Sequence, residues 1–150
     1  MLTFTRSAAD AVADHAREGA PSEVCGILAG SHEQSPESDG DAQSDRVTDV
    51  YRTENVAETP RTRYRIDPEQ QLAALERADA EGLDVIGFYH SHPTGPAEPS
   101  ETDAARATWR GYAYVIWTPT ADPVLGAWRW RGSPEGFNRE PVCVVNLDDS

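Results

Sequence analysis

The chain has 150 residues, in which 26 acidic side chains face 13 basic ones, and its formal net charge at pH 7 is -13. So negative a protein repels phosphate backbones and anionic lipid headgroups, which argues against nucleic acids and membranes as partners. Every basic residue is arginine, and an acidic excess without lysine is typical of proteins from salt-loving microbes, whose cytoplasm screens repulsion between surface charges.

The length and the apolar runs predict a single cytoplasmic domain. A chain of 150 residues can bury one core without disulfides or metals as staples. It begins M-L-T-F-T-R, which lacks the features of a signal peptide, and it contains no run of about 18 apolar residues. We therefore expect residues 1–150 to form one domain in the cytoplasm. Cys25 and Cys143 lie in short apolar runs, where we expect reduced, buried thiols.

The first third of the chain predicts a helix, two strands and a loop. A helix is expected from Ser7, its cap, to the stop at Gly19, because small apolar residues recur there at helical spacing. The short apolar run Glu23 to Gly30 predicts a buried strand. Residues 31–45 have almost nothing to bury, so we expect a flexible acidic loop. Arg46 to Val56 then predicts a second strand.

The rest of the chain alternates strands and helices. Thr62 to Ile66 predicts a short edge strand, and a helix capped by Asp67, with Leu72, Leu75 and Ala78 as its apolar stripe, is expected to end at Gly82. Leu83 to Tyr89 predicts a central strand, and Ser100 to Trp109 a short helix. Three further strands are expected at Tyr112 to Trp117, Val124 to Trp130 and Pro141 to Leu147. The fold class is therefore α/β, an α+β sandwich with a mixed central β-sheet flanked by helices.

The stretch from Gly87 to Asp103 carries a candidate metal site. Residues two apart in a strand point to the same side, so His90 and His92 aim both imidazoles at one spot if the strand continues through them. Ser100 can cap the following helix, whose first turn brings the carboxylate of Asp103 back beside the histidines. Two histidines, an aspartate and a water are the ligands of a catalytic zinc site with one open position.

Each part of this pattern also has an interpretation without function. A lone H-x-H is common by chance, and S-x-x-D at a helix start is an ordinary capping box. Glu23 at the beginning of a strand would usually be a solvated charge, and Ser91 a surface hydroxyl. The order and the spacing of the whole set are what favour a site.

The full set resembles the signature of the JAMM (MPN-plus) metalloproteases, a distant Glu followed by H-[ST]-H-x7-S-x2-D. Glu23, His90, Ser91, His92, Ser100 and Asp103 match it at every position. The resemblance extends from about Thr3 to Trp117 and implies an MPN/JAMM-like, cytidine-deaminase-like fold. Within the family, the chain is similar to the compact archaeal-type (desampylase-like) members, which act on ubiquitin-like modifiers or on sulfur-carrier proteins.

The resemblance also implies a role for each residue. His90, His92 and Asp103 would bind one zinc ion per chain, and Glu23 would be the general base that takes a proton from the attacking water. Ser100 would donate a hydrogen bond to the oxyanion of the tetrahedral intermediate. Ser91 would support the ligands.

The partners implied are ubiquitin-like modifiers and their conjugates. In this family the modifier's tail, ending in Gly-Gly, lies extended in a groove, and Asn55 to Ile66 is the candidate edge for it. The residues expected to contact the tail are Asn55, Thr62, Arg63 and Tyr64. A plain connecting loop is the alternative for this segment.

The other notable side chains have ordinary interpretations. His15 and His32 are expected to be solvated, and Trp117, Trp128 and Trp130 to pack mainly in the core rather than form a partner surface.

Three functions remain open from the sequence. The leading one is a zinc isopeptidase that removes a ubiquitin-like modifier from lysine side chains or from linear fusions. The second is a protease that processes a sulfur-carrier protein, and the third is a non-catalytic scaffold with the same fold. A zinc deaminase is excluded, because its H-x-E and P-C-x-x-C pattern is absent.

Overall fold

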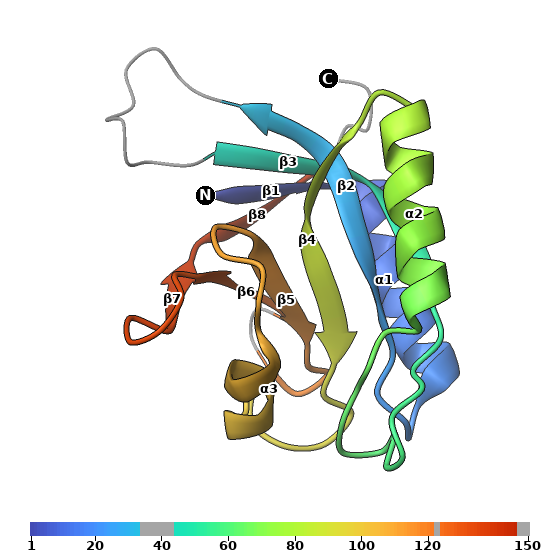
Figure 1. The fold of residues 1–150 in the computed structure, drawn as a ribbon, viewed down its shortest axis with the longest axis vertical. Helices are drawn as coiled ribbons and strands as arrows, with labels where there is room; N and C mark the ends of the chain where they lie inside the picture. The colour runs from blue at the N-terminus through green and yellow to red at the C-terminus, as the bar shows by residue number, and fades with distance from the viewer. Residues whose placement is uncertain (34–43, 122–123, 147–150) are drawn as a thin grey trace.

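A computed structural model describes residues 1–33, 44–121 and 124–146 (Figure 1). Its helices and strands are β1 (Leu2–Thr5), α1 (Arg6–Gly19), β2 (Cys25–Glu33), β3 (Ser44–Thr53), α2 (Pro68–Ala80), β4 (Asp84–Ser91), α3 (Glu101–Arg106), β5 (Ala113–Trp117), β6 (Leu125–Trp130), β7 (Phe137–Glu140) and β8 (Val142–Val145).

The strands form one mixed sheet in the order β7-β6-β5-β4-β2-β3-β1-β8. The pairs β1/β3, β1/β8 and β4/β5 are parallel, and the other pairs are antiparallel. Helices α1 and α2 lie on opposite faces of this sheet (Figure 1), and each covers its own cluster of buried side chains. The expected mixed sheet flanked by helices is confirmed. Within the described ranges, no helix has the length and apolar character needed to cross a bilayer.

Helix α1 begins two residues earlier than a cap at Ser7 predicts. Thr5, the last residue of β1, accepts a hydrogen bond from the backbone N–H of Ala8 at 3.2 Å. Ser7 is therefore inside the helix, and the prediction that it is the cap is wrong. The stop at Gly19 is confirmed.

Helix α2 has the predicted cap and two of the three predicted stripe residues: Ala78 is buried and Leu75 packs against the core, whereas Leu72 does not. Asp67 accepts a hydrogen bond from the N–H of Glu69, and Pro68 opens the helix as expected. The sheet side is formed by Ala74 and Ala78, whereas Leu72 is 57% exposed. The small side chains let the helix lie close to the sheet, and a helix that faces the sheet with Ala74 and Ala78 turns Leu72 toward solvent.

Both ends of the loop expected at residues 31–45 belong to strands. Residues 31–33 extend β2 and residues 44–45 begin β3, where they pair with each other, as in His32 with Asp45. Residues 34–43, the middle of that loop, lie outside the described residues. His32 is exposed, as expected, and its imidazole also lies 2.7 Å from the Asp45 carboxylate.

Several short strands were predicted incorrectly or not at all. Strands β1 and β7 were not predicted, and both are only four residues long. The expected strand from Thr62 to Ile66 is absent: its last residue makes only an isolated bridge to Asn55. Cys25 is buried as expected, but Cys143 is exposed, because β8 is an edge strand whose alternate side chains point outward.

The largest buried polar side chain, Arg129 on β6, was not anticipated. It is 2% exposed and bonds to the carboxylates of Asp45 at 2.8 Å and Glu140 at 2.6 Å. Asp45 had been expected in the acidic loop, yet it is also buried. A buried guanidinium needs such partners, so this network fixes β3, β6 and β7 together. Of the tryptophans, Trp117 and Trp128 are buried as predicted.

His15 was expected to be solvated, but it packs on the sheet beside Tyr89. Its Nδ1 lies 2.7 Å from the Tyr89 hydroxyl. Burial, helped by the charge of Arg52, lowers the pKa of His15 to about 4. The folded state therefore holds a neutral imidazole.

We expect His15→Gln to reduce the acid sensitivity of folding. Because the folded pKa lies below the unfolded value, His15 stabilises the fold above about pH 6.5, and this contribution is lost as the pH falls toward 4. For a partly solvated side chain the loss between pH 7 and pH 5 is about 2 kcal/mol at most. Urea unfolding of both proteins at each pH measures it, and equal losses in the two proteins would contradict the prediction.

Candidate metal centre

The antiparallel pairing of β2 with β4 brings Glu23 to the histidines. Cys25 at the start of β2 lies opposite His90 near the end of β4. Glu23, two residues before Cys25, therefore lies beside the residues that follow His90. Side chains more than sixty positions apart in the chain meet at one end of the sheet.

His90 and His92 aim at the same place because the extended backbone continues past β4. The N–H of His92 donates to the carbonyl of Trp117 at 2.9 Å, which prolongs the parallel pairing with β5 by one residue. The two Nε2 atoms are 3.1 Å apart. Both imidazoles are buried, at 2% and 6% exposure.

Helix α3 delivers the carboxylate of Asp103. Ser100 accepts a hydrogen bond from the N–H of Asp103 at 3.0 Å, and Asp103 Oδ2 accepts one from the N–H of Ser100 at 2.8 Å, which completes a capping box. The same Oδ2 atom lies 3.2 Å from His90 Nε2 and 3.3 Å from His92 Nε2. Helix capping and contact with the histidines therefore coexist in one side chain.

The three atoms have the spacing of metal ligands. His90 Nε2, His92 Nε2 and Asp103 Oδ2 form a triangle with sides of 3.1, 3.2 and 3.3 Å. In a tetrahedral site with metal-to-ligand distances of about 2.0 to 2.1 Å, ligand atoms lie about 3.3 Å apart. The triangle thus has the dimensions of one face of such a tetrahedron.

Glu23 completes the cluster from the other side. Its carboxylate groups with the two histidines, with the nearest atoms of all three side chains within 4.8 Å of one another. The side chain is 6% exposed, and Oε1 is buried without a hydrogen-bond partner in the described part of the chain. An unsatisfied buried carboxylate oxygen is costly, so it indicates a site that awaits a water or an ion.

The environment shifts the titration of these groups in opposite directions. Burial raises the pKa of Glu23 to about 7, and nearby Asp103 adds to the rise. Burial opposes the charge of Asp103 too, but hydrogen bonds with His90 and His92 outweigh it and lower the pKa of Asp103. Burial lowers the pKa of His90, which favours the neutral imidazole that binds metals. The cluster thus holds an anionic Asp103 beside a carboxyl group that titrates near neutrality.

Hydrogen bonds fix the backbone and rings around this cluster. Ser91 is fully buried: its hydroxyl accepts from the N–H of Val24 at 2.9 Å, and its own N–H donates to the carbonyl of Val24. His92 Nδ1 lies 2.9 Å from the carbonyl of Pro96. That contact makes Nδ1 the donor and leaves the Nε2 lone pair for a metal.

A folded segment between β3 and α2, residues 55–66, covers the cluster. The Asn55 carboxamide donates to the carbonyls of Glu23 and Arg63, both at 2.9 Å, and accepts from the N–H groups of Ala57 and Arg65 at 3.1 and 2.9 Å. All four hydrogen-bonding positions of this amide are used. The ring of Tyr64 then stacks on His90, with centroids 4.2 Å apart and planes inclined by 18°.

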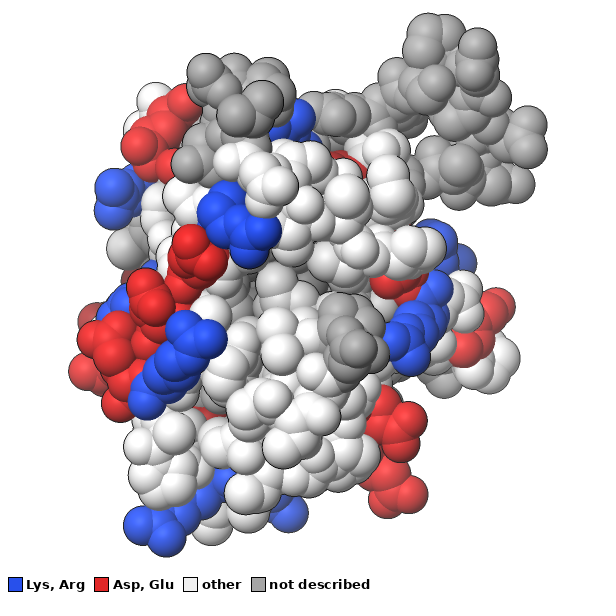
Figure 2. All heavy atoms as spheres, turned by 180° about the vertical axis from the view of Figure 1, so that it is seen from behind, with Lys and Arg blue, Asp and Glu red and all other residues white. Residues whose placement is uncertain are grey.

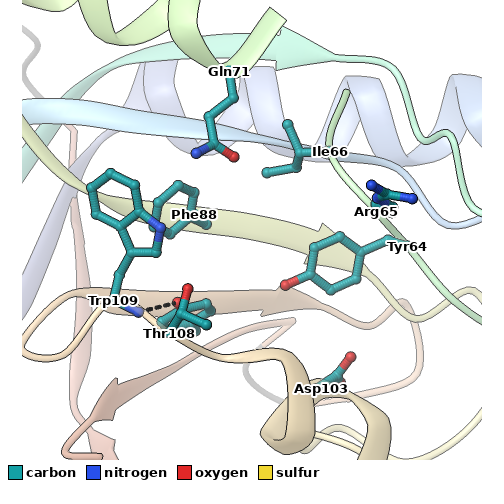
Figure 3. Close-up of a pocket in the computed structure, with 9 residues that line it drawn as sticks. Tyr64, Arg65, Ile66, Gln71, Phe88, Asp103, Thr108 and Trp109 are labelled. Atoms are coloured by element: carbon teal, nitrogen blue, oxygen red, sulfur yellow. Dashed lines mark hydrogen bonds between the residues drawn. The ribbon is translucent and has the colours of Figure 1, made fainter. Parts of the chain in front are cut away.

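A pocket of about 180 Å³ opens beside Asp103 (Figure 3). Phe88 and Trp109 form an aromatic wall, the Gln71 amide lies above them, and the Tyr64 hydroxyl points toward them from the opposite side (Figure 3). The remaining lining residues are Arg65, Ile66, Asp103, Thr108 and Tyr114. The site therefore has an apolar compartment with a few polar groups directly beside the ligand triangle.

The structure brings some of the predicted site residues together and separates others. Glu23, the two histidines and Asp103 converge, and Ser100 and Ser91 lie next to them as described above. Of the four residues expected to contact a substrate tail, Tyr64 lines the pocket, Asn55 is tied into the backbone, and Thr62 and Arg63 are exposed outside it. The pocket's aromatic wall was not predicted, although the cluster W-R-G-Y from Trp109 to Tyr112 hinted at it.

Residues 5–131 match the family model described as prokaryotic homologs of the JAB domain. Among curated proteins, the chain is 43% identical to a desampylase of Haloferax volcanii over 147 residues, which are 95% of this chain and 96% of that protein. It is 36% identical to a CysO-cysteine peptidase of Mycobacterium tuberculosis, covering 97% of this chain and 92% of the other.

A solved structure shares the fold closely. The solution structure of a protein from Desulfitobacterium hafniense superposes with a TM-score of 0.82 at 28% identity and covers 98% of this chain and 94% of that one. The similarity therefore extends over the whole described sheet and both large helices.

Proposed function

The chain belongs to the prokaryotic JAB-domain (JAMM) family of hydrolases, and we propose that it is a zinc-dependent isopeptidase that cleaves ubiquitin-like modifiers from their conjugates. The bond cut would follow the modifier's C-terminal Gly-Gly. The observation that carries this proposal is the ligand triangle of His90, His92 and Asp103 beside the unsatisfied carboxylate of Glu23.

We infer that His90, His92 and Asp103 hold one zinc ion. Two imidazoles and one carboxylate are a donor set that zinc accepts readily, and three protein ligands are the number found in catalytic sites. Zinc in that position would lower the pKa of a bound water toward neutrality and polarise the scissile carbonyl.

Glu23 would act as the general base. Its buried carboxylate lies within 4.8 Å of the ligand atoms of His90 and His92, where it can accept the proton of the attacking water and later deliver it to the leaving amine. Two hydrogen bonds fix the backbone of Glu23 and so position its carboxylate. The backbone N–H of Glu23 donates to the carbonyl of Pro60, and the backbone carbonyl of Glu23 accepts from the Asn55 side chain.

Ser100 would stabilise the oxyanion that forms on the scissile carbonyl. Its hydroxyl accepts the N–H of Asp103 in the capping box, and a hydroxyl that accepts through one lone pair can still donate its hydrogen. Removal of one such donor typically costs about 3 kcal/mol of transition-state stabilisation. Ser91 supports the base through the backbone of Val24.

We place the modifier's tail along residues 55–66 and the pocket beside Asp103. The ring of Tyr64 stacks on His90 beside this path, and glycines, which have no side chains, would let an extended backbone pass it and come close to the ligands. The aromatic compartment suits an apolar side chain upstream of the Gly-Gly. Asn55, Thr62 and Arg63 would then act at the edge of this path.

A sulfur-carrier protein is the second candidate substrate. It is favoured by the 36% identity with a CysO-cysteine peptidase over nearly the whole chain. The purified protein, loaded with zinc, can be given a lysine-linked modifier conjugate and, separately, a carrier with a cysteine on its terminal glycine. Cleavage of the conjugate alone supports the isopeptidase, cleavage of the cysteine adduct alone supports the carrier protease, and cleavage of neither contradicts both.

We expect Asn55→Ala to lower kcat for the conjugate while the zinc content stays near one per chain. The variant removes the donor to the carbonyl of Glu23 and the link to residues 63 and 65, whereas the proposed ligands lie on β4, the loop after it, and α3. A loss of about tenfold to a hundredfold is expected, because small errors in the position of a base are costly. Steady-state kinetics and metal analysis measure the two effects.

Asn55→Asp separates the donor function of the Asn55 side chain from its acceptor function. Aspartate can still accept from residues 57 and 65, but it cannot donate to the carbonyls of Glu23 and Arg63. If the position of Glu23 matters, this variant loses as much kcat as Asn55→Ala, and Asn138→Ala on the exposed face of β7 loses none. A kcat for Asn55→Asp equal to that of the parent would contradict the role.

A further inference from the structure

Three arginines alternate along the segment that covers the candidate metal centre. Arg61, Arg63 and Arg65 are all exposed, and the only acidic residue in the same segment, residues 55–66, is Glu58. The segment thus has a net charge of +2 in a chain whose net charge is -13. Positively charged spheres gather in Figure 2 at the end of the molecule where Figure 1 shows the connection between β3 and α2.

These three guanidinium groups stand together within residues 61–65 and lack carboxylate partners in the described ranges, whereas the other unpaired surface arginines, such as Arg110 and Arg139, are scattered along the chain. Arg17, Arg52 and Arg77 form ion pairs with Asp14, Glu18 and Glu81. Within residues 1–33, 44–121 and 124–146, no ion pair is formed by Arg61, Arg63 or Arg65. Such a concentration of uncompensated positive charge is unusual in a protein with twice as many acidic as basic residues.

The backbone that carries these arginines is firmly held. Asn55 bonds to the carbonyl of Arg63 and the N–H of Arg65, the carbonyl of Arg65 accepts from Val56 at 2.8 Å, and Pro60 accepts from Glu23 at 2.7 Å. Tyr64, between two of the arginines, is anchored on His90. The charges are therefore presented from a fixed strip at the mouth of the site rather than from a free loop.

We propose that Arg61, Arg63 and Arg65 form a docking surface for an acidic face of the modifier protein whose tail enters the site. This inference rests on the proposed function and adds the chemistry of the partner: a folded protein with Asp and Glu side chains near the start of its C-terminal tail. The acidic remainder of this chain repels such a partner, so the arginine strip directs it to the one end where the tail can reach the ligands.

The test compares two substrates of the zinc-loaded protein and its variant Arg61→Glu/Arg63→Glu/Arg65→Glu. One substrate is a conjugate of an acidic modifier, and the other is a short uncharged peptide that ends in Gly-Gly and carries a reporter amine. The variant should raise the KM of the conjugate at least about tenfold more than that of the peptide, and the difference should shrink as NaCl rises. Circular dichroism verifies folding at each salt concentration.

Two controls make the outcomes decisive. Arg17→Glu/Arg110→Glu/Arg139→Glu changes the net charge by the same amount on exposed residues outside the segment 55–66, and it should leave the ratio of the two KM values at the parent value. A variant in which the three strip arginines become Gln should shift the ratio in the same direction, by less. Equal effects on conjugate and peptide, or an equal shift in the control triple, overturn the docking surface. If the parent protein cleaves neither substrate, the proposed function fails instead.

Discussion

Glu23→Gln should reduce kcat for the modifier conjugate by about a hundredfold to ten-thousandfold, the range expected when a general base is removed. Glutamine has the same shape but cannot accept a proton at neutral pH. Glu23 Oε1 makes no hydrogen bond within the described residues, so the substitution breaks no structural contact of that atom. Single-turnover cleavage and metal analysis of the same preparations measure the effect.

The metal content of this variant decides between two roles of Glu23. Its carboxylate lies close enough to His90 and His92 to be a ligand itself. If Glu23 is only a base, Glu23→Gln keeps a zinc content near one per chain. If Glu23 is a ligand, the zinc content of this variant falls. Glu54→Gln, at an exposed carboxylate nearby in the fold, should leave both kcat and zinc content at the parent values. Normal turnover by Glu23→Gln would contradict the proposed mechanism altogether.

The local geometry of the site could be predicted because it follows from short-range rules. His90 and His92 share a side because strand residues alternate, and the pairing of His92 with Trp117 prolongs that alternation as far as required. Ser100 and Asp103 form the capping box that their spacing predicts. The central strands and the two long helices were likewise predictable from apolar runs and caps.

Contacts between distant segments could not be derived in the same way. Arg129 and Asp45 are buried together on β6 and β3, but each charge alone predicts a solvated residue. The stacking of Tyr64 on His90 depends on how Asn55 folds its segment back on Glu23. Because Asn55 uses its side chain for bonds that a strand partner would supply, the expected strand at Thr62 to Ile66 does not form.

The two strands that the sequence does not predict show a different limit. β1 and β7 have four residues each, too few for a period of two to stand out from chance. The pairing of such short strands depends on strands already in place, since β1 joins the sheet through β3 and β8 through β1. The exposure of Cys143 follows from the edge position of β8. None of these residues contacts the metal centre, so these errors left the predicted site unaffected.

Asp103→Asn should abolish metal binding while it preserves helix α3. The asparagine oxygen can still accept the N–H of Ser100, which Asp103 Oδ2 now does at 2.8 Å, so the capping box survives. The amide is neutral and a poor ligand for zinc. Loss of a residue that only supports a ligand lowers metal affinity by at most about a hundredfold. Because Asp103 is proposed to be a ligand itself, we expect the affinity for zinc to fall by more than that. Competition with a chelator measures it, and an unchanged affinity would exclude Asp103 as a ligand.

Ser100→Ala is the matched variant, because it removes the cap from the other side. The N–H of Asp103 then loses its acceptor, which costs about 1 kcal/mol of stability, but the carboxylate remains beside His90 and His92. Zinc affinity should therefore stay within about threefold of the parent, while kcat falls about a hundredfold through loss of the oxyanion donor. Ser100 and Asp103 are joined by reciprocal hydrogen bonds, so each variant disturbs the same capping box. A loss of zinc affinity in Asp103→Asn but not in Ser100→Ala would therefore separate metal binding from helix capping. Equal losses of zinc affinity in both would mean that the position of α3, rather than the Asp103 carboxylate, controls the metal.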